Sequence, residues 1–225
     1  MNKDYTHITV VMDKSGSMAP LTNDTINGYN GFLQKQKELP GKLTVSLLQF
    51  STTSHYDYRF KDIHEIPLLN YFASGGTALY DAISIAMDDT GNALRDMPES
   101  VRPSKVIFAI ITDGEENSSK MYPGEYGKRK IKEQINHQQS VYNWEVVFLG
   151  SNLDVVKHAE GLGLRSSSTL NYSSEKLFGM LTPGEYVMSS YSALGSGVSC
   201  ARNASDFTAG EFFSNVGLTE EKVSS

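Results

Sequence analysis

The sequence of 225 residues has a single cysteine and lacks any long hydrophobic run. Cys200 has no partner for an internal disulfide, which is the pattern expected in a reducing compartment. The longest uninterrupted apolar stretch covers residues 106–111, far short of the roughly 20 apolar residues that a membrane-spanning helix needs. The apolar run that follows the charged N-terminal residues is also too short for a signal peptide. We therefore expect a cytoplasmic protein that does not use a membrane as a partner.

Basic residues are also scarce. The chain has 20 Lys and Arg against 26 Asp and Glu, and its densest basic run, residues 128–130, is typical of a solvated helix face. Nucleic acid is therefore not expected as a partner. The five histidines show no zinc-site spacing, and the chain lacks the phosphate-binding loop Gly-x-x-x-x-Gly-Lys-[Ser/Thr] and the nucleophile elbow Gly-x-Ser-x-Gly. These absences argue against the common zinc, nucleotide and serine-hydrolase sites.

Apolar stretches and helical patterns alternate along the chain. The expected strands lie at residues 8–12, 43–50, 55–60, 106–111 and 144–149. The expected helices lie at residues 21–38, from 77 onward, at 128–139 and at 153–160. Two strands, 8–12 and 106–111, are continuously apolar, which is typical of parallel strands buried on both faces. The strands at 43–50 and 55–60 can pair as a hairpin.

This order predicts an α/β domain over residues 1–174, doubly wound around a mostly parallel central sheet with one antiparallel edge strand and helices on both faces. A short last strand is expected at residues 169–172. Residues 175–225 are expected to form a helical C-terminal extension that packs on or continues the same domain. Its glycines, Gly195 and Gly197 among them, are expected to interrupt helices.

Five oxygen-bearing side chains lie where strands end or a helix begins: Asp13, Ser15, Ser17, Thr77 and Asp113. Asp13 and Asp113 each closely follow the last apolar residue of a strand. If those two strands are neighbours the carboxylates converge, because ligands gather at the carboxyl ends of parallel strands. The sequence therefore predicts an oxygen-lined site for a hard divalent cation.

The donor set also indicates which ion to expect. Magnesium prefers octahedral oxygen coordination and keeps several waters, whereas calcium usually takes several carboxylates. Two carboxylates with three hydroxyls favour Mg²⁺, with Mn²⁺ or Ca²⁺ as substitutes. Neutral hydroxyls leave the ion electron-poor, so a carboxylate from outside can complete its shell. The expected partner is therefore a protein that presents an Asp or Glu.

The sequence Asp-Lys-Ser-Gly-Ser at residues 13–17 resembles the D-x-S-G-S motif of von Willebrand factor type A (VWA) domains. In that family the motif, a later threonine and a later aspartate form the metal-ion-dependent adhesion site (MIDAS). The resemblance assigns Thr77 and Asp113 to the two later positions. The segments at residues 75–82 and 112–117 look like those of bacterial or phage-type members. The match covers residues from about 5 to 160 by element order, and the family's final strand and helix are not placed by it.

Three further acidic residues lie close to the predicted ligands in sequence. Asp81, four residues after Thr77, either orients a ligand or a water behind the metal or points to solvent. Glu115 and Glu116 either coordinate the ion or belong to a solvated acidic loop, and the loop is favoured because a third carboxylate would weaken the attraction for a partner's acid.

The residues leave competing functions open. The favoured one is a Mg²⁺-dependent protein-interaction module without catalytic turnover, and the alternative is a metal-assisted hydrolase or phosphotransferase at the same site. Against the enzyme, Ser15 stands where an aspartyl-phosphate mechanism needs a second aspartate as acid or base. A third hypothesis is a regulatory part of a larger bacterial or phage assembly, which the resemblance links to movement of a terminal helix.

Overall fold

The computed structural model describes residues 1–114, 116–150, 161–164, 182–204 and 212. These residues form a five-stranded sheet in the order β3-β2-β1-β4-β5. The strands are β1 (Asn2–Asp13), β2 (Lys42–Phe50), β3 (Ser54–Asp62), β4 (Pro103–Thr112) and β5 (Glu145–Gly150). Neighbouring strands are parallel, except that β2 and β3 are antiparallel. The predicted mostly parallel sheet with one antiparallel edge strand is therefore confirmed.

The central strand β1 shows why the middle strands are rich in apolar residues on both faces. Ile8 pairs with Val45 of β2 on one side and with Ile107 of β4 on the other. Successive side chains of a strand point to opposite faces of the sheet. Met12 accordingly belongs to the hydrophobic cluster on one face and Val11 to the cluster on the other. Because helices cover both faces, neither set of side chains is left to water.

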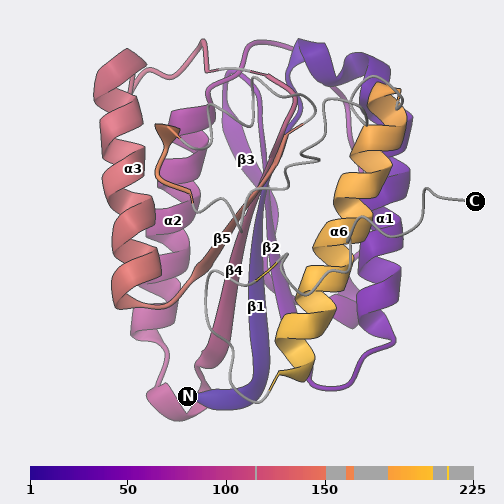
Figure 1. Cartoon of the computed structure of the whole chain (residues 1–225), viewed down its shortest axis with the longest axis vertical. Helices are drawn as coiled ribbons and strands as arrows, with labels where there is room; N and C mark the ends of the chain where they lie inside the picture. The colour runs from indigo at the N-terminus through magenta and orange to yellow at the C-terminus, as the bar shows by residue number, and fades with distance from the viewer. Residues whose placement is uncertain (115, 151–160, 165–181, 205–211, 213–225) are drawn as a thin grey trace, which may run out of the picture.

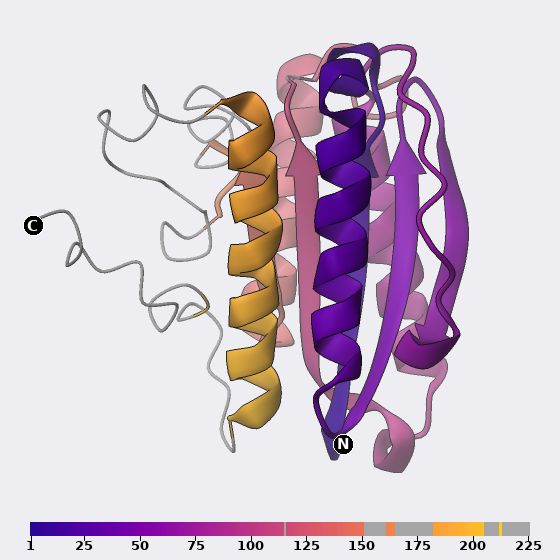
Figure 2. The same ribbon diagram turned by 90° about the vertical axis from the view of Figure 1, so that its right-hand side faces the viewer.

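Four α-helices of the described residues pack on the sheet in two layers (Figure 1). One face carries α1 (Thr22–Lys37) and α6 (Pro183–Asn203), which lie side by side in Figure 2. The other face carries α2 (Leu79–Asp96) and α3 (Gly124–Val141). Short 3-10 turns at Gly16–Leu21, Ile63–Glu65 and Glu99–Val101 complete the connections. The predicted doubly wound arrangement is confirmed.

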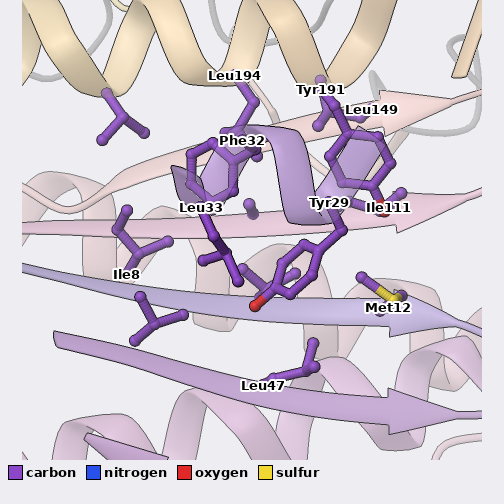
Figure 3. Packing of buried hydrophobic residues seen from close by; sticks show 14 of the residues in the cluster. Ile8, Met12, Tyr29, Phe32, Leu33, Leu47, Ile111, Leu149, Tyr191 and Leu194 are labelled. Carbon is purple, nitrogen blue, oxygen red and sulfur yellow. The ribbon is translucent and has the colours of Figure 1, made fainter. Parts of the chain in front are cut away.

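The core between the sheet and the α1–α6 layer is shown in Figure 3. Phe32 of α1 and Leu194 of α6 both belong to this cluster, together with Ile111 of β4. The rings of Tyr29 and Tyr191 meet edge to face, with their centroids 6.1 Å apart. Full burial of each large apolar side chain contributes about 1.5–3 kcal/mol. Helix α6 is therefore part of the core.

Helix α6 corrects one prediction made from the sequence. Thr182 and Glu185 form a capping box at its start, and Pro183 occupies the first turn, where its missing N–H costs nothing. Gly195 and Gly197 do not interrupt the helix but lie inside it. A Cβ atom at Gly197 would collide with the ring of Phe212. The glycine is thus explained by close packing, and such packing outweighs its low helix propensity.

The C-terminal end of α6 is tied to the connection between α1 and β2. Arg202 Nη1 donates to the carbonyl oxygen of Gln36 at 2.7 Å, and Nη2 donates to the carbonyls of residues 39–41 at 2.8–3.1 Å. Lys105 of β4 donates through Nζ to the carbonyl of Ala204 at 2.6 Å. These bonds satisfy carbonyl groups that a helix end and a turn would otherwise leave unpaired.

Two predicted elements, the helix at residues 153–160 and the strand at 169–172, lie outside the described residues, and the domain boundary after residue 174 stays a prediction. None of the helices in the described part of the chain is long and apolar enough to cross a membrane.

Candidate metal centre

Asp13 lies at the carboxyl end of β1 and is fully buried. Its Oδ1 accepts a hydrogen bond from the Ser15 N–H at 2.6 Å, and its Oδ2 accepts one from Thr112 Oγ1 at 2.5 Å. The register of the sheet explains the second bond, since Met12 pairs with Ile111 and the next residues of both strands are therefore adjacent. Strand pairing thus fixes one of the two predicted carboxylates.

A chain of hydrogen bonds runs from Asp13 to Asp113 across two loops. The hydroxyls of Ser15 and Ser17 lie 3.0 Å apart, and Ser17 Oγ donates to Asp113 Oδ1 at 2.8 Å. Asp13 and Ser15 are buried, Asp113 is half-buried and Ser17 is exposed. The arrangement therefore has a closed rear side and a side that opens to solvent.

Thr77 brings the third loop to the same place. Its buried side chain lies beside Gly114, where an added Cβ would be 3.6 Å from Thr77 Oγ1 and 3.5 Å from Ser17 Oγ. The backbone also joins the loop at residues 13–17 to the loop that contains Thr77, because the Gly16 N–H donates to the Gly75 carbonyl at 2.9 Å. All five residues predicted as ligands therefore lie in one cluster.

The two carboxylates sit in an environment that disfavours their charge. Burial raises the pKa of Asp13 to about 6, against the lowering effect of hydrogen bonds from Thr112 and Ser15, and the charge of Asp113 raises it further. Burial also raises the pKa of Asp113, against the hydrogen bond from Ser17. Two desolvated acids in one site ionise more readily when a cation is beside them.

The donor set fits a hard divalent cation. Within the described ranges, no group of three or more His, Cys, Asp or Glu side chains is placed to hold a metal, so hydroxyls have to supply part of any coordination shell. Carboxylate and hydroxyl oxygens suit Mg²⁺, Mn²⁺ or Ca²⁺ better than a softer ion.

Asp81 and Glu116 are engaged in holding the loop that follows β4. The Asp81 carboxylate accepts hydrogen bonds from the backbone N–H groups of residues 120–122, at 2.7–3.2 Å. Glu116 accepts from the N–H of Tyr80 at 3.0 Å and from the backbone of residues 118 and 119 at 2.9 and 2.7 Å. Both acids therefore join the start of α2 to this loop, and Glu115 lies outside the described residues.

Three supporting residues were not among those predicted from the sequence. Thr112 holds Asp13 through its hydroxyl, and Tyr71 donates through Oη to the Asp13 carbonyl at 2.6 Å. Asn117 Oδ1 accepts from the Thr77 N–H at 2.9 Å, and the Asn117 N–H donates to the Thr77 carbonyl at 3.0 Å. Thr112 had a visible signal, a polar residue that ends an apolar strand beside Asp113, but Tyr71 and Asn117 had none.

The comparisons with known proteins rest on structure. No protein-family model and no curated protein matches the sequence. The PilB minor pilin of Streptococcus sanguinis, solved as a mutant, is 11% identical with a TM-score of 0.54, over 87% of this chain and 61% of that one. The manganese-loaded TRAP protein of Plasmodium vivax is 16% identical with a TM-score of 0.51, over 82% of this chain and 75% of that one.

A further match carries a metal in the corresponding kind of site. Proximal thread matrix protein 1 from the mussel byssus, solved with zinc in its MIDAS motif, is 15% identical with a TM-score of 0.50. The match covers 83% of this chain but only 48% of the mussel chain. At this level of identity the likeness concerns the fold. This chain has the fold of von Willebrand factor type A domains, as its sequence motif predicts.

Proposed function

We propose that the chain is a protein-interaction module that depends on a divalent cation, Mg²⁺ in the first place, and that docks an Asp or Glu of a partner protein. Asp13, Ser15, Ser17, Thr77 and Asp113 would hold the ion. When bound, the ion supplies a positive charge to which an outside carboxylate can add. The cytoplasmic location and the bacterial or phage type remain predictions from the sequence.

The observation that carries this proposal is the chain of hydrogen bonds that links Asp13, Ser15, Ser17 and Asp113, with Thr77 beside it. Its buried end has a carboxylate fixed by two hydrogen bonds. Toward its other end, Ser17 is exposed to solvent and Asp113 is half-buried. A cation held there is screened from behind and accessible from outside, which is the geometry that a docking site for an acid requires.

The solved structures support a divalent cation in this position. The Plasmodium protein is manganese-loaded and the mussel protein carries zinc in its MIDAS motif. Different divalent ions thus occupy proteins of this fold, so the preference for Mg²⁺ here rests on the donor set alone.

The alternative function, a hydrolase or phosphotransferase, has less support from the contacts of Ser15 and Ser17 than the binding function has. The two serine hydroxyls bond to each other and to Asp113. Among the hydrogen bonds of the described residues, none joins a histidine to Ser15 or Ser17, and the carboxylate that accepts from Ser17, that of Asp113, is one of the groups that would hold the ion. We therefore propose a binding function without turnover.

Thermal unfolding with and without metal tests the ion. An ion that binds only the folded chain stabilises it by about 2.7 kcal/mol at a concentration of 100 times Kd. We expect Mg²⁺ and Mn²⁺ to raise Tm by several degrees, Asp13→Ala to abolish the rise, and the exposed control Asp96→Ala to keep it. An equal response in the parent and Asp13→Ala, or none in either, would reject the site.

Selection from a displayed peptide library tests the docked group. The library is bound in Mg²⁺ and eluted with EDTA, and we expect the eluted peptides to share an Asp or Glu. Replacing that acid by Asn or Gln should remove binding. Peptides that bind equally well in EDTA, or that keep binding after the replacement, would contradict the docking of an acid at the metal.

A further inference from the structure

A second site lies at the other end of the sheet from the metal centre. A cavity of about 560 Å³ is bounded by the C-terminal halves of α2 and α3 and by the amino ends of β4 and β5. Both helices lie on the same face of the sheet (Figure 1). The apolar part of its wall consists mainly of Met87, Leu94, Val106 and Trp144. Cavities that hold small molecules have volumes of roughly 300–1,000 Å³ and walls of this composition.

A positive charge without a counter-ion lines one end of this cavity. Arg102 Nη2 donates to the carbonyl oxygens of Met97 at 2.8 Å and Arg95 at 3.3 Å, which places its guanidinium at the C-terminal end of α2. Its Nε is buried and has no hydrogen-bond partner. Among the ion pairs of the described residues, none includes Arg102. A buried donor on a guanidinium is costly unless an acceptor, best an anion, meets it.

A hydrogen-bond acceptor without a partner lines the cavity on α3, opposite Gly91 of α2. Gln138 of α3 has a buried Oε1 without a partner, and its Nε2 reaches toward Gly91. Gly91 precedes Arg95 by four residues, which is about 6 Å along a helix axis. The cavity therefore offers an acceptor and a cationic donor roughly one helical turn or more apart, with apolar wall around them.

Aromatic and apolar side chains stand at the rim. Val141 and Tyr142 end α3 with 59% and 60% of their surface exposed, and both line the cavity. The rings of Tyr142 and His137 meet edge to face with their centroids 5.4 Å apart. Exposed side chains of this kind beside a cavity can cover an occupant and lose their contact with water.

We propose that this cavity binds a small carboxylate with an apolar, preferably aromatic, body and a hydrogen-bond donor at its opposite end. The carboxylate meets Arg102, the body lies against Trp144 and Leu94, and the donor meets Gln138. This site is independent of the metal centre, and nothing in its chemistry requires a divalent ion.

Fluorescence offers a direct test because Trp144, in the cavity wall, is the only tryptophan of the chain. The probe is 4-aminophenylacetate, which carries an N–H donor and a carboxylate at opposite ends of an aromatic ring. Its methyl ester lacks the charge, and phenylacetate lacks the donor. We expect saturable quenching by the probe and binding at least about tenfold weaker for the ester, as the loss of a charged hydrogen bond predicts.

Two variants locate the binding. Gly91→Leu should block binding of the probe. Gly91 lines the cavity and its Cβ would meet only Gln138 Nε2, at 3.9 Å, so a leucine fits on the helix and its side chain fills part of the cavity. Gly31→Leu on α1 is the matched control, since its Cβ would meet nothing within 4 Å and the substitution is also helical. Arg102→Gln should weaken the binding of 4-aminophenylacetate and leave the binding of its methyl ester unchanged. Asp13→Asn should bind the probe as the parent does.

Three results would overturn the proposal. One is the absence of saturable quenching with all three compounds, which would mean that water satisfies the polar atoms of the cavity. Another is an ester that binds as tightly as the acid. The third is a Gly91→Leu protein, folded by its melting curve, that binds the probe as tightly as Gly31→Leu does.

Discussion

Replacing Asp13 by Asn should stabilise the metal-free protein at neutral pH, although it removes a metal ligand. Asn has nearly the same shape, so its Oδ1 can still accept from the Ser15 N–H, and the Thr112 hydroxyl can rotate to accept from its amide. What the substitution removes is a buried negative charge. Without a cation, this charge destabilises the fold.

The magnitude follows from the pKa of Asp13. Burial raises it from 3.8 to about 6, and at about 1.4 kcal/mol for each pH unit this amounts to about 3 kcal/mol at full ionisation. The unfolded chain releases this proton near pH 3.8, while the folded chain keeps it until about pH 6. Folded protein thus binds more protons between these values, and its stability falls as pH rises through them. The loss is nearly complete above about pH 7 and absent below about pH 3.

Urea unfolding in EDTA, from pH 4 to pH 8, measures the effect. We expect Asp13→Asn to exceed the parent by up to about 3 kcal/mol at pH 7.5, or roughly 6–12 °C in Tm for a domain of this size. The difference should shrink to about 0.5 kcal/mol at pH 4, and saturating Mg²⁺ should reverse it at neutral pH. A variant no more stable than the parent at pH 7.5, or equally favoured at pH 4 and pH 7.5, would refute the reasoning.

Three further predictions concern the metal and the packing. Mg²⁺ affinity, measured by calorimetric titration, should fall at least about tenfold from pH 7.5 to pH 5, because protonation of Asp13 competes with the ion once pH drops below about 6. Asp81→Ala should lower the free energy of unfolding in urea by about 1–3 kcal/mol, because three N–H groups of the loop at residues 120–122 lose their acceptor. Unchanged stability would contradict this role. Gly28→Ala should lower the free energy of unfolding by about 1–3 kcal/mol, because the added Cβ collides with the ring of Tyr191. Gly31→Ala should raise it by about 0.5–1 kcal/mol, because its Cβ meets nothing within 4 Å and alanine favours the helix. Equal effects of the two substitutions would contradict the close packing of α1 on α6.

The parts of the fold that could be predicted from sequence depend on local pattern. Residues 8–12 of β1 and 106–111 of β4 are almost entirely apolar because both faces of the sheet are covered, and this pattern is visible without coordinates. The ligands were predictable for a related reason. Strand order brings Asp13 and Asp113 together, because ligands gather at the carboxyl ends of neighbouring parallel strands.

The remainder depends on contacts between distant residues. Gly197 reads as a helix breaker, and only the ring of Phe212 explains why α6 has no side chain there. Asp81 was expected to stand behind the metal or to face solvent, yet its carboxylate caps backbone N–H groups about forty residues away. Tyr71 likewise reaches the Asp13 carbonyl from a loop with no regular pattern. Such roles leave no periodic trace in a sequence.

The bonds of Arg202 set a limit on how far the chain can be shortened from its C-terminal side. A truncation before this residue would remove the donors from the carbonyls of Gln36 and residues 39–41 and leave the end of α1 open to fraying. A truncation before α6 as a whole would in addition uncover Phe32 and its neighbours on the sheet. A minimal folding unit, or a fusion of another protein to this one, should therefore keep Ala204, whose carbonyl receives Lys105, and extend through Phe212, whose buried ring packs on Gly197.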